Sequence, residues 1–242
     1  MIIVGNDVVD LGVSLPTLKS QDARFLKRVF TPAEQILIST SPNPELQLWL
    51  FWAAKETAYK IISKIKTPPV FSHKLFQITI QSHSEQSVSK QNLQITYDEY
   101  VIPAFGIWDA QKLHVVGNLD VTEPKKSVLD TDLTAQTTVQ IYSLTRDDII
   151  YWERQNNLNS HFSKAEQESI NHSASAIAKF KLKQSLAQNF NWNIQQLEVI
   201  RPSLNKKMHP PFLLYHGQKT NIDISLSHHG EWVAWVYNSA QT

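Results

Sequence analysis

The strongest hydrophobic pattern in the chain runs from Glu45 to Lys64 and predicts one long α-helix. Apolar side chains recur there at intervals of three and four residues, which places them on one face of a helix. The members of this stripe are Leu46, Trp49, Leu50, Ala53, Ala54, Thr57, Ala58, Ile61, Ile62 and Ile65. Trp52, Glu56 and Lys60 follow one another at intervals of four on an adjacent face. A carboxylate and an ammonium group therefore border the apolar stripe.

Shorter apolar and alternating segments on either side of this helix predict β-strands. A buried strand is expected at residues 2–9, broken at Gly5-Asn6-Asp7. The other predicted strands cover residues 76–80, 93–97, 100–108 and 113–119, and then 139–144, 197–200, 212–215, 222–226 and 232–236.

The order of the predicted elements occurs twice along the chain, which indicates a duplication. Phe30-Thr31-Pro32-Ala33-Glu34 precedes the first long helix, and Phe162-Ser163-Lys164-Ala165-Glu166 precedes a second one at residues 173–191. Residues 123–137 are polar without a periodic apolar face, as expected of a linker. The predicted fold is α+β, with similar subdomains at residues 1–122 and 138–242. Each subdomain has a small antiparallel sheet packed on its long helix, and a pseudo-twofold axis relates the two.

Composition excludes several classes of protein. The 242 residues carry 23 Lys+Arg and 22 Asp+Glu, a net charge of +1, and contain no cysteine. Disulfides, thiolate nucleophiles and cysteine metal sites are therefore excluded. The six glycines do not have the spacing of a dinucleotide-binding loop or a P-loop, and G-x-S-x-G is absent. No apolar run is long enough to span a bilayer, and no targeting signal is seen, so a cytoplasmic protein without membrane or nucleic-acid partners is expected.

Positive charge is concentrated in the second half. Residues 164–219 contain eight Lys or Arg and three Asp or Glu, with Lys179, Lys181 and Lys183 in the predicted helix and Lys206 and Lys207 after it. This segment is either a solvated basic face or a binding surface for a small phosphate-rich ligand.

Three short motifs contain groups that could carry chemistry. Asp7 is either a turn carboxylate or a metal ligand at the break in its strand. Glu56 and Lys60 form either a surface ion pair or a half-buried functional pair. In Ser225-Leu226-Ser227-His228-His229, adjacent side chains point to opposite faces of a strand, so the two histidines do not share one metal. His228 is either structural or a hydrogen-bond donor to phosphate.

Together and in this order, the motifs resemble the signatures of the 4′-phosphopantetheinyl transferase superfamily. The matching residues are Gly5-x-Asp7, Trp52-x-x-Lys55-Glu56-x-x-x-Lys60 and Ser225-x-Ser227-His228. The segment from Arg24 to Glu34 is similar to the one that follows the first signature in holo-acyl-carrier-protein synthases.

The resemblance implies the fused, pseudo-dimeric type of the family, with one composite site and a monomeric protein. The order of the halves is reversed relative to that type, because Asp7 and Glu56 lie in the first half and His228 ends the second. The first-half equivalent of the histidine strand is expected at residues 113–119, and the second-half equivalent of the Asp7 strand at 139–144. Val9 occupies the position of a further metal-binding carboxylate, and the loop at 206–210 is altered.

The activity implied by the resemblance is transfer of the phosphopantetheine arm of coenzyme A to a serine of an acyl or peptidyl carrier protein, with Mg²⁺. Asp7 and Glu56 would be the metal ligands, and Asp7, Glu56 and Lys60 the catalytic residues, with Glu56 as the base. The implied coenzyme A contacts are His228, Lys179, Lys183, Ser227, Lys207, Arg24 and Arg28. The alternative is a non-catalytic member that binds coenzyme A or a carrier protein.

Overall fold

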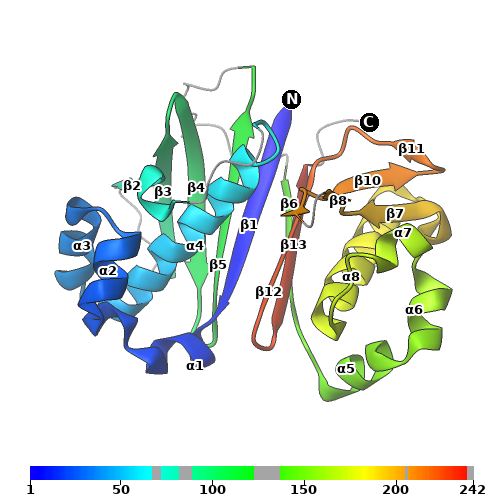
Figure 1. The fold of residues 1–242 in the computed structure, drawn as a ribbon, viewed down its shortest axis with the longest axis horizontal. Coiled ribbons are helices and arrows are strands. Elements are labelled where there is room, and N and C mark those ends of the chain that lie inside the picture. The colour runs from blue at the N-terminus through cyan, green and yellow to red at the C-terminus, as the bar shows by residue number, and fades with distance from the viewer. Residues whose placement is uncertain (67–71, 82–88, 123–136, 205–206, 239–242) are drawn as a thin grey trace.

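The computed structural model describes residues 1–66, 72–81, 89–122, 137–204 and 207–238, and these form two α+β halves that lie side by side (Figure 1). The first half contains a five-stranded antiparallel sheet with the order β1-β5-β4-β3-β2. Its elements are β1 (Ile2–Asp10), α1 (Leu11–Ser14), α2 (Ala23–Val29), α3 (Pro32–Ser39), α4 (Pro44–Ile62), β2 (Gln77–Gln81), β3 (Lys90–Tyr97), β4 (Tyr100–Trp108) and β5 (Lys112–Asp120), with 3-10 turns at Leu15–Thr17, Lys19–Gln21 and His73–Leu75. The predicted α+β class is confirmed.

The second half contains smaller sheets around another long helix. Three strands form a sheet with the order β12-β13-β6, and the remaining strands pair as β11-β10-β7 and β8-β9. The elements are β6 (Thr137–Ser143), α5 (Arg146–Glu153), α6 (Gln155–His161), α7 (Lys164–Gln167), α8 (Ser173–Phe190), β7 (Leu197–Ile200), β8 (Ser203–Leu204), β9 (Lys207–Met208), β10 (Phe212–Tyr215), β11 (Gln218–Lys219), β12 (Ile224–His229) and β13 (Trp232–Asn238), with a 3-10 turn at Ile194–Gln196. None of the helices in the described ranges combines the length and the hydropathy that crossing a bilayer requires.

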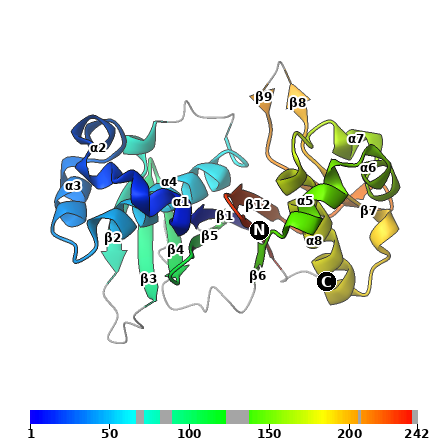
Figure 2. The ribbon, with the colours of Figure 1, turned by 90° about the horizontal axis from the view of Figure 1, so that it is seen from below.

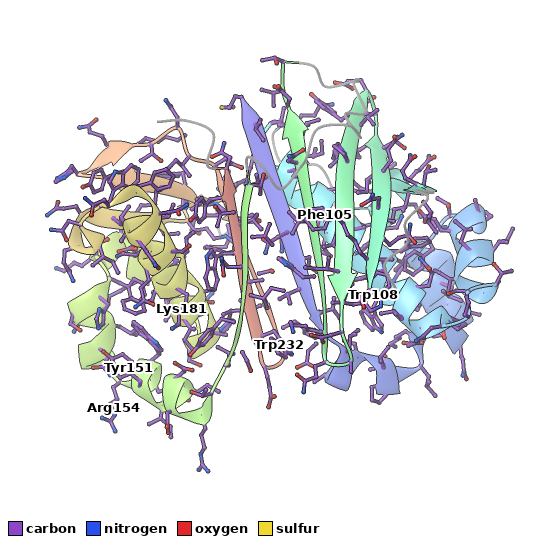
Figure 3. The ribbon with its side chains drawn as sticks, turned by 180° about the vertical axis from the view of Figure 1, so that it is seen from behind. Phe105, Trp108, Tyr151, Arg154, Lys181 and Trp232 are labelled. Carbon is purple, nitrogen blue, oxygen red and sulfur yellow. The ribbon has the colours of Figure 1, made fainter. Side chains whose placement is uncertain are left out.

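Each half has its own hydrophobic core, and a small cluster joins them. The first core surrounds α4 and the second surrounds α8. Between the halves, Val4, Phe105 and Val116 of the first sheet pack with Val236 of β13. Figure 3 shows the molecule from this side, with Phe105 and Trp232 labelled. Lys112 Nζ lies 4.5 Å from the centre of the Trp232 ring.

The two long helices agree closely with the periodic patterns, but the expected break in the first strand is wrong. β1 is continuous from Ile2 to Asp10. Gly5 faces α4, where a Cβ atom would lie 2.6 Å from the Thr57 carbonyl oxygen and 2.7 Å from Ile61 Cγ1. This glycine therefore permits close packing of strand on helix, and it does not interrupt the strand.

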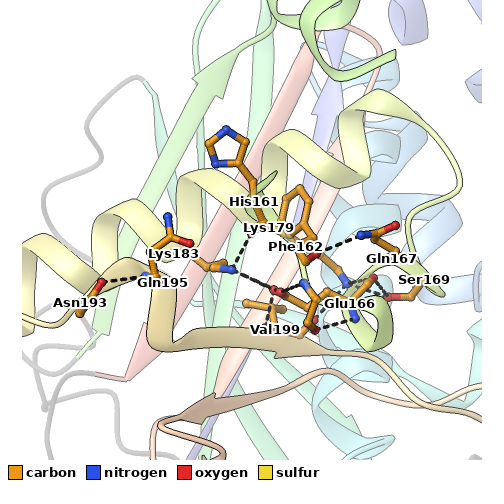
Figure 4. Close-up of polar contacts among 11 residues, drawn as sticks. His161, Phe162, Glu166, Gln167, Ser169, Lys179, Lys183, Asn193, Gln195 and Val199 are labelled. Atoms are coloured by element: carbon orange, nitrogen blue, oxygen red, sulfur yellow. Dashed lines mark hydrogen bonds and ion pairs between the residues drawn. The ribbon is translucent and has the colours of Figure 1, made fainter. Parts of the chain in front are cut away.

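The segments before the two long helices form matching polar networks. In the first half, a capping box joins Thr31 and Glu34, and Glu34 also accepts hydrogen bonds from Ile78 N (2.9 Å) and Lys55 Nζ (2.8 Å). In the second half, Ser163 and Glu166 form the same capping box. Glu166 accepts from Val199 N (2.9 Å) and Lys183 Nζ (3.3 Å), as Figure 4 shows. Lys183 is thus the counterpart of Lys55.

Strand order corrects one expected correspondence between the halves. β13 lies between β12 and β6, just as β5 lies between β4 and β1. The first-half counterpart of the histidine strand is therefore β4, and not the segment at residues 113–119, which belongs to β5.

Candidate functional site

The edge of β1 that does not pair with β5 faces β12 (Figure 2). Side chains join the two strands. Alternate residues of β12 and of the loop before it accept hydrogen bonds from backbone N–H groups of β1. The bonds are Val4 N to Asp223 Oδ2 (2.7 Å), Asn6 N to Ser225 Oγ (3.2 Å) and Asp10 N to His229 Nδ1 (3.0 Å). At the boundary between the halves, side chains of the second half thus accept the hydrogen bonds that backbone N–H groups on the edge of β1 donate.

Lys60 of α4 and Lys64, two residues beyond the end of this helix, satisfy carbonyl groups on the same edge. Lys64 Nζ donates to the Val4 carbonyl, to Asp223 Oδ2 and to the Ile224 carbonyl, each at 2.7 Å. One turn earlier, Lys60 Nζ donates at 2.8 Å to the Asn6 carbonyl and to Asp7 Oδ1. These contacts hold α4, β1 and β12 in a fixed relation.

A cavity of about 290 Å³ opens beside this junction, and residues of both halves line it. Asp7, Lys60 and Lys64 come from the first half. From the second half come Lys179, Arg201, Ser225, Ser227 and His228. Asp7 and His228, which are far apart in the sequence, therefore share one cavity.

The environment of Asp7 is suited to a cation. Burial is the main cause that raises the pKa of its carboxyl group, and the charge of Glu56 raises it further, while Lys60 acts in the opposite direction. A partly desolvated carboxylate beside a second carboxylate gains from a hard divalent ion. In the described ranges, no group of three or more His, Cys, Asp or Glu could hold a metal. Asp7 and Glu56 are the carboxylates here that could hold a divalent ion, with water and phosphate oxygens completing its ligands.

Glu56 does not line the cavity, although its charge acts on Asp7. Its Oε1 atom lies 3.6 Å from His73 Nε2, and both side chains are about one-fifth exposed, at 23% and 19%. Glu56 therefore lies outside the cavity lining, near enough to Asp7 to affect its pKa and beside the 3-10 turn that begins at His73.

His228 faces the cavity next to a second imidazole. Its ring lies edge-on to His172, with the ring centres 4.6 Å apart. Desolvation lowers the pKa of His228 to about 4, and nearby positive groups, His172 first and then Lys60 and Arg201, contribute to the shift. Without an anion beside it, the imidazole is neutral at pH 7 and can donate one N–H.

The two expected lysine contacts of α8 are occupied by structural hydrogen bonds. Lys179 Nζ donates to the Glu166 carbonyl (2.8 Å), Ser169 Oγ (2.7 Å) and the Val199 carbonyl (3.0 Å). It lines the cavity, and burial lowers its pKa to about 8. Lys183 Nζ donates to the His161 carbonyl and to Glu166, and it does not line the cavity.

The other expected contacts have different positions. Ser227 lines the cavity, and its Oγ atom accepts a hydrogen bond from Asn6 Nδ2 at 3.1 Å. Arg24 and Arg28 are exposed on α2 and do not line the cavity. Lys207 has its backbone in β9, but its side chain lies outside the described part of the chain, as does all of Lys206.

Arg201, Lys64 and His73 also belong to this region, and no sequence motif marks them. Arg201 lines the cavity and donates from Nε to the His209 carbonyl at 3.2 Å. Arg201 is one of the eight basic residues at 164–219, and the sequence does not separate it from the other seven. Lys64 and His73 carry no motif, and only their contacts in the fold reveal their positions.

Comparison with known proteins supports the resemblance found in the motifs. Residues 3–105 match the family model described as the 4′-phosphopantetheinyl transferase superfamily, and this segment contains the Asp7 and Glu56 motifs. The resemblance is confirmed over this segment. No match is found among curated proteins.

Among solved structures, the chain is similar to holo-[acyl-carrier-protein] synthase from Neisseria meningitidis. The sequence identity is 16% and the TM-score is 0.36, and the match covers 49% of this chain and 98% of the synthase.

Proposed function

Because its first half matches the 4′-phosphopantetheinyl transferase superfamily, we propose that the protein transfers the phosphopantetheine arm of coenzyme A to a serine of an acyl or peptidyl carrier protein. The observation that carries the proposal is the shared cavity. A carboxylate–lysine pair, Asp7 and Lys60, and two cation or N–H donors, Arg201 and His228, line it from opposite halves. Coenzyme A has a pyrophosphate and a separate 3′-phosphate, so it needs polar groups at two places.

The donor would be bound by both halves. The pyrophosphate is assigned to the side of Asp7 and Lys60, where Mg²⁺ held with Glu56 would neutralise its charge. The 3′-phosphate is assigned to Arg201 and His228. A guanidinium group can make two parallel hydrogen bonds to phosphate, and the neutral imidazole adds one.

The residues of the first half would perform the chemistry. The serine oxygen of the carrier protein forms a bond to the phosphorus of phosphopantetheine, and the phosphorus–oxygen bond to adenosine 3′,5′-bisphosphate breaks. Glu56, beside His73 and near Asp7, would accept the serine proton. Lys60 neutralises charge on the leaving phosphate. The nucleophile belongs to the carrier protein, so this chain needs none of its own.

A non-catalytic coenzyme A-binding protein is the second candidate. Val9 is buried at 3% exposure within the first core, so the position at which a third carboxylate would be expected contributes no oxygen to the cavity. A protein of this kind would bind coenzyme A but would not transfer phosphopantetheine.

Intact-mass spectrometry tests the proposal. The protein is incubated with coenzyme A, Mg²⁺ and apo-carrier proteins of fatty-acid, polyketide and peptide-synthetase type. We expect at least one carrier to gain the mass of phosphopantetheine, and EDTA to abolish the gain. His228→Ala should raise KM for coenzyme A about tenfold, by loss of a hydrogen bond to a charged group, with little change in kcat. Binding of coenzyme A without transfer to any carrier would favour the second candidate.

A further inference from the structure

Three residues of the helix motif in α4 converge on His73, which lies outside that motif. The Trp52 ring is 4.5 Å from the His73 ring, centre to centre, and Lys55 Nζ donates to the His73 carbonyl at 3.1 Å. The Glu56 carboxylate approaches His73 Nε2 at 3.6 Å. One residue of the 3-10 turn therefore contacts the aromatic ring, the ammonium and the carboxylate of the motif.

The core fixes the position of His73. Lys55 is fully buried, and its ammonium also binds Glu34 Oε1 at 2.8 Å and the Phe76 carbonyl. The Phe76 N–H closes the turn onto the His73 carbonyl at 3.1 Å. Trp52 is supported on its own side by the ring of Phe25 at 5.6 Å. The imidazole is thus anchored through its backbone and its ring face.

A carboxylate on a glutamate has three rotatable bonds, so an anchored neighbour restricts its position. The distance of 3.6 Å is within ion-pair range but longer than a hydrogen bond, so a small movement of Glu56 would complete the contact. We propose that His73 is a positioning residue that holds the Glu56 carboxylate, through Nε2, in the orientation required to accept the serine proton. The inference rests on the proposed transferase function.

The second half provides a matched control. His161 presents its carbonyl to Lys183 at 3.0 Å, and its ring lies 4.8 Å from Phe180. These contacts are of the same kind as those that His73 makes with Lys55 and Trp52. Because Lys183 is the counterpart of Lys55, the residue after it, Gln184, stands where Glu56 stands in α4. His161→Ala therefore removes similar packing without affecting a carboxylate.

Replacement of His73 by alanine, glutamine and asparagine tests the inference. Loss of a residue that orients a catalytic carboxylate costs about 10- to 100-fold in activity. We expect His73→Ala to lower kcat by at least about tenfold at unchanged KM for coenzyme A. His73→Gln, whose amide nitrogen can occupy the place of Nε2, should retain most of the rate. His73→Asn should resemble His73→Ala, and His161→Ala should keep the wild-type kcat.

A double-mutant cycle separates positioning from general structural support. In the Glu56→Gln background, His73→Ala should cause no further loss of the residual rate. Additive losses, or equal losses in the glutamine and alanine variants at equal unfolding temperatures, would overturn the inference. If the unsubstituted chain transfers phosphopantetheine and His73→Ala has its full kcat, only this inference fails. If the unsubstituted chain transfers nothing, the proposed function fails as well.

Discussion

Asp7 is the residue at which burial and function conflict most clearly. Burial and the nearby charge of Glu56 raise its pKa, while the ion pair with Lys60 at 2.8 Å lowers it. A raised pKa in the folded state means that ionisation of Asp7 at neutral pH costs free energy of folding. Such a cost is expected at a functional site where a buried carboxylate binds a cation.

Asp7→Asn should therefore separate activity from stability. We expect transfer to be abolished, because the proposed Mg²⁺ site would lose one of its two carboxylates. The unfolding temperature should stay the same or rise, because a desolvated charge is removed. Intact-mass assays and thermal unfolding at pH 7 measure the two effects. Asp98→Asn, which alters an exposed carboxylate paired with Lys66, serves as the control and should change neither. Normal transfer by Asp7→Asn would contradict the assignment.

At the lysines of α8, the structure shows roles that residue type alone does not indicate. The resemblance and the basic character of the helix imply that Lys179 and Lys183 bind phosphate. Their ammonium groups instead satisfy backbone carbonyls and Glu166 inside the second half. The repeated segment around Glu166 carried the relevant signal, because Glu34 and Lys55 form the same kind of pair in the first half.

At the scale of elements, the long helices were predictable because their periodicity is a local property of the sequence. α4 and α8 begin and end within one or two residues of the expected bounds. The junction of β1 with β12 was not predictable in the same way, because its bonds join residues about 220 positions apart, such as Asn6 and Ser225. The alternation of Asp223, Ser225 and His229 is visible in the sequence, but nothing in it identifies the strand edge that these side chains cover.

His114 of β5 makes this junction sensitive to acid. It is fully buried beside Asn6, with Asn6 Nδ2 3.0 Å from His114 Nε2, and burial lowers its pKa to about 3. In the unfolded chain the pKa of His114 is near 6.5. Between pH 6.5 and pH 3, therefore, the unfolded chain binds a proton at His114 and the folded chain does not. Stability contributed by neutral His114 is present above pH 6.5 and is lost as the pH falls toward 3.

His114→Gln should flatten the acid dependence of stability. One excluded proton contributes a slope of up to about 1.4 kcal/mol per pH unit to the free energy of unfolding. We expect the variant to lose less stability than the unsubstituted chain between pH 6.5 and pH 4.5, measured by urea unfolding. His209→Gln is the control, since its side chain lies outside the Asn6 network. Identical slopes for the unsubstituted chain and His114→Gln would show that His114 does not exclude the proton.

At the scale of the whole molecule, the contact between the halves is what forms the cavity. The motifs predict a reversed order of the halves, and the structure brings Asp7 and His228 to one cavity. The two ends of the described chain are also joined across the boundary between the halves, because Asn238 Nδ2 donates to the Ile2 carbonyl at 2.8 Å. The pseudo-twofold relation and the monomeric state remain predictions.

A circular permutant tests whether chain order is immaterial. The chain would begin at Thr137, continue to its present end, pass through a short glycine–serine linker to Met1 and finish at Thr122. Because β1 and β12 are joined by side chains, we expect the permutant to keep the unfolding temperature and the KM for coenzyme A. A permutant that folds with the same stability but transfers nothing would show that the native connection is needed for the site.

The composite site is tested most directly by the rate of transfer to an apo-carrier protein as a function of coenzyme A concentration, for the intact chain and one variant from each half. The account predicts transfer by the unsubstituted chain and almost none by Glu56→Gln. For Arg201→Ala it predicts a KM for coenzyme A raised at least about tenfold with kcat largely kept, because the second half binds the distant end of the donor. An unchanged KM in Arg201→Ala, together with normal transfer, would contradict a donor held between the two halves.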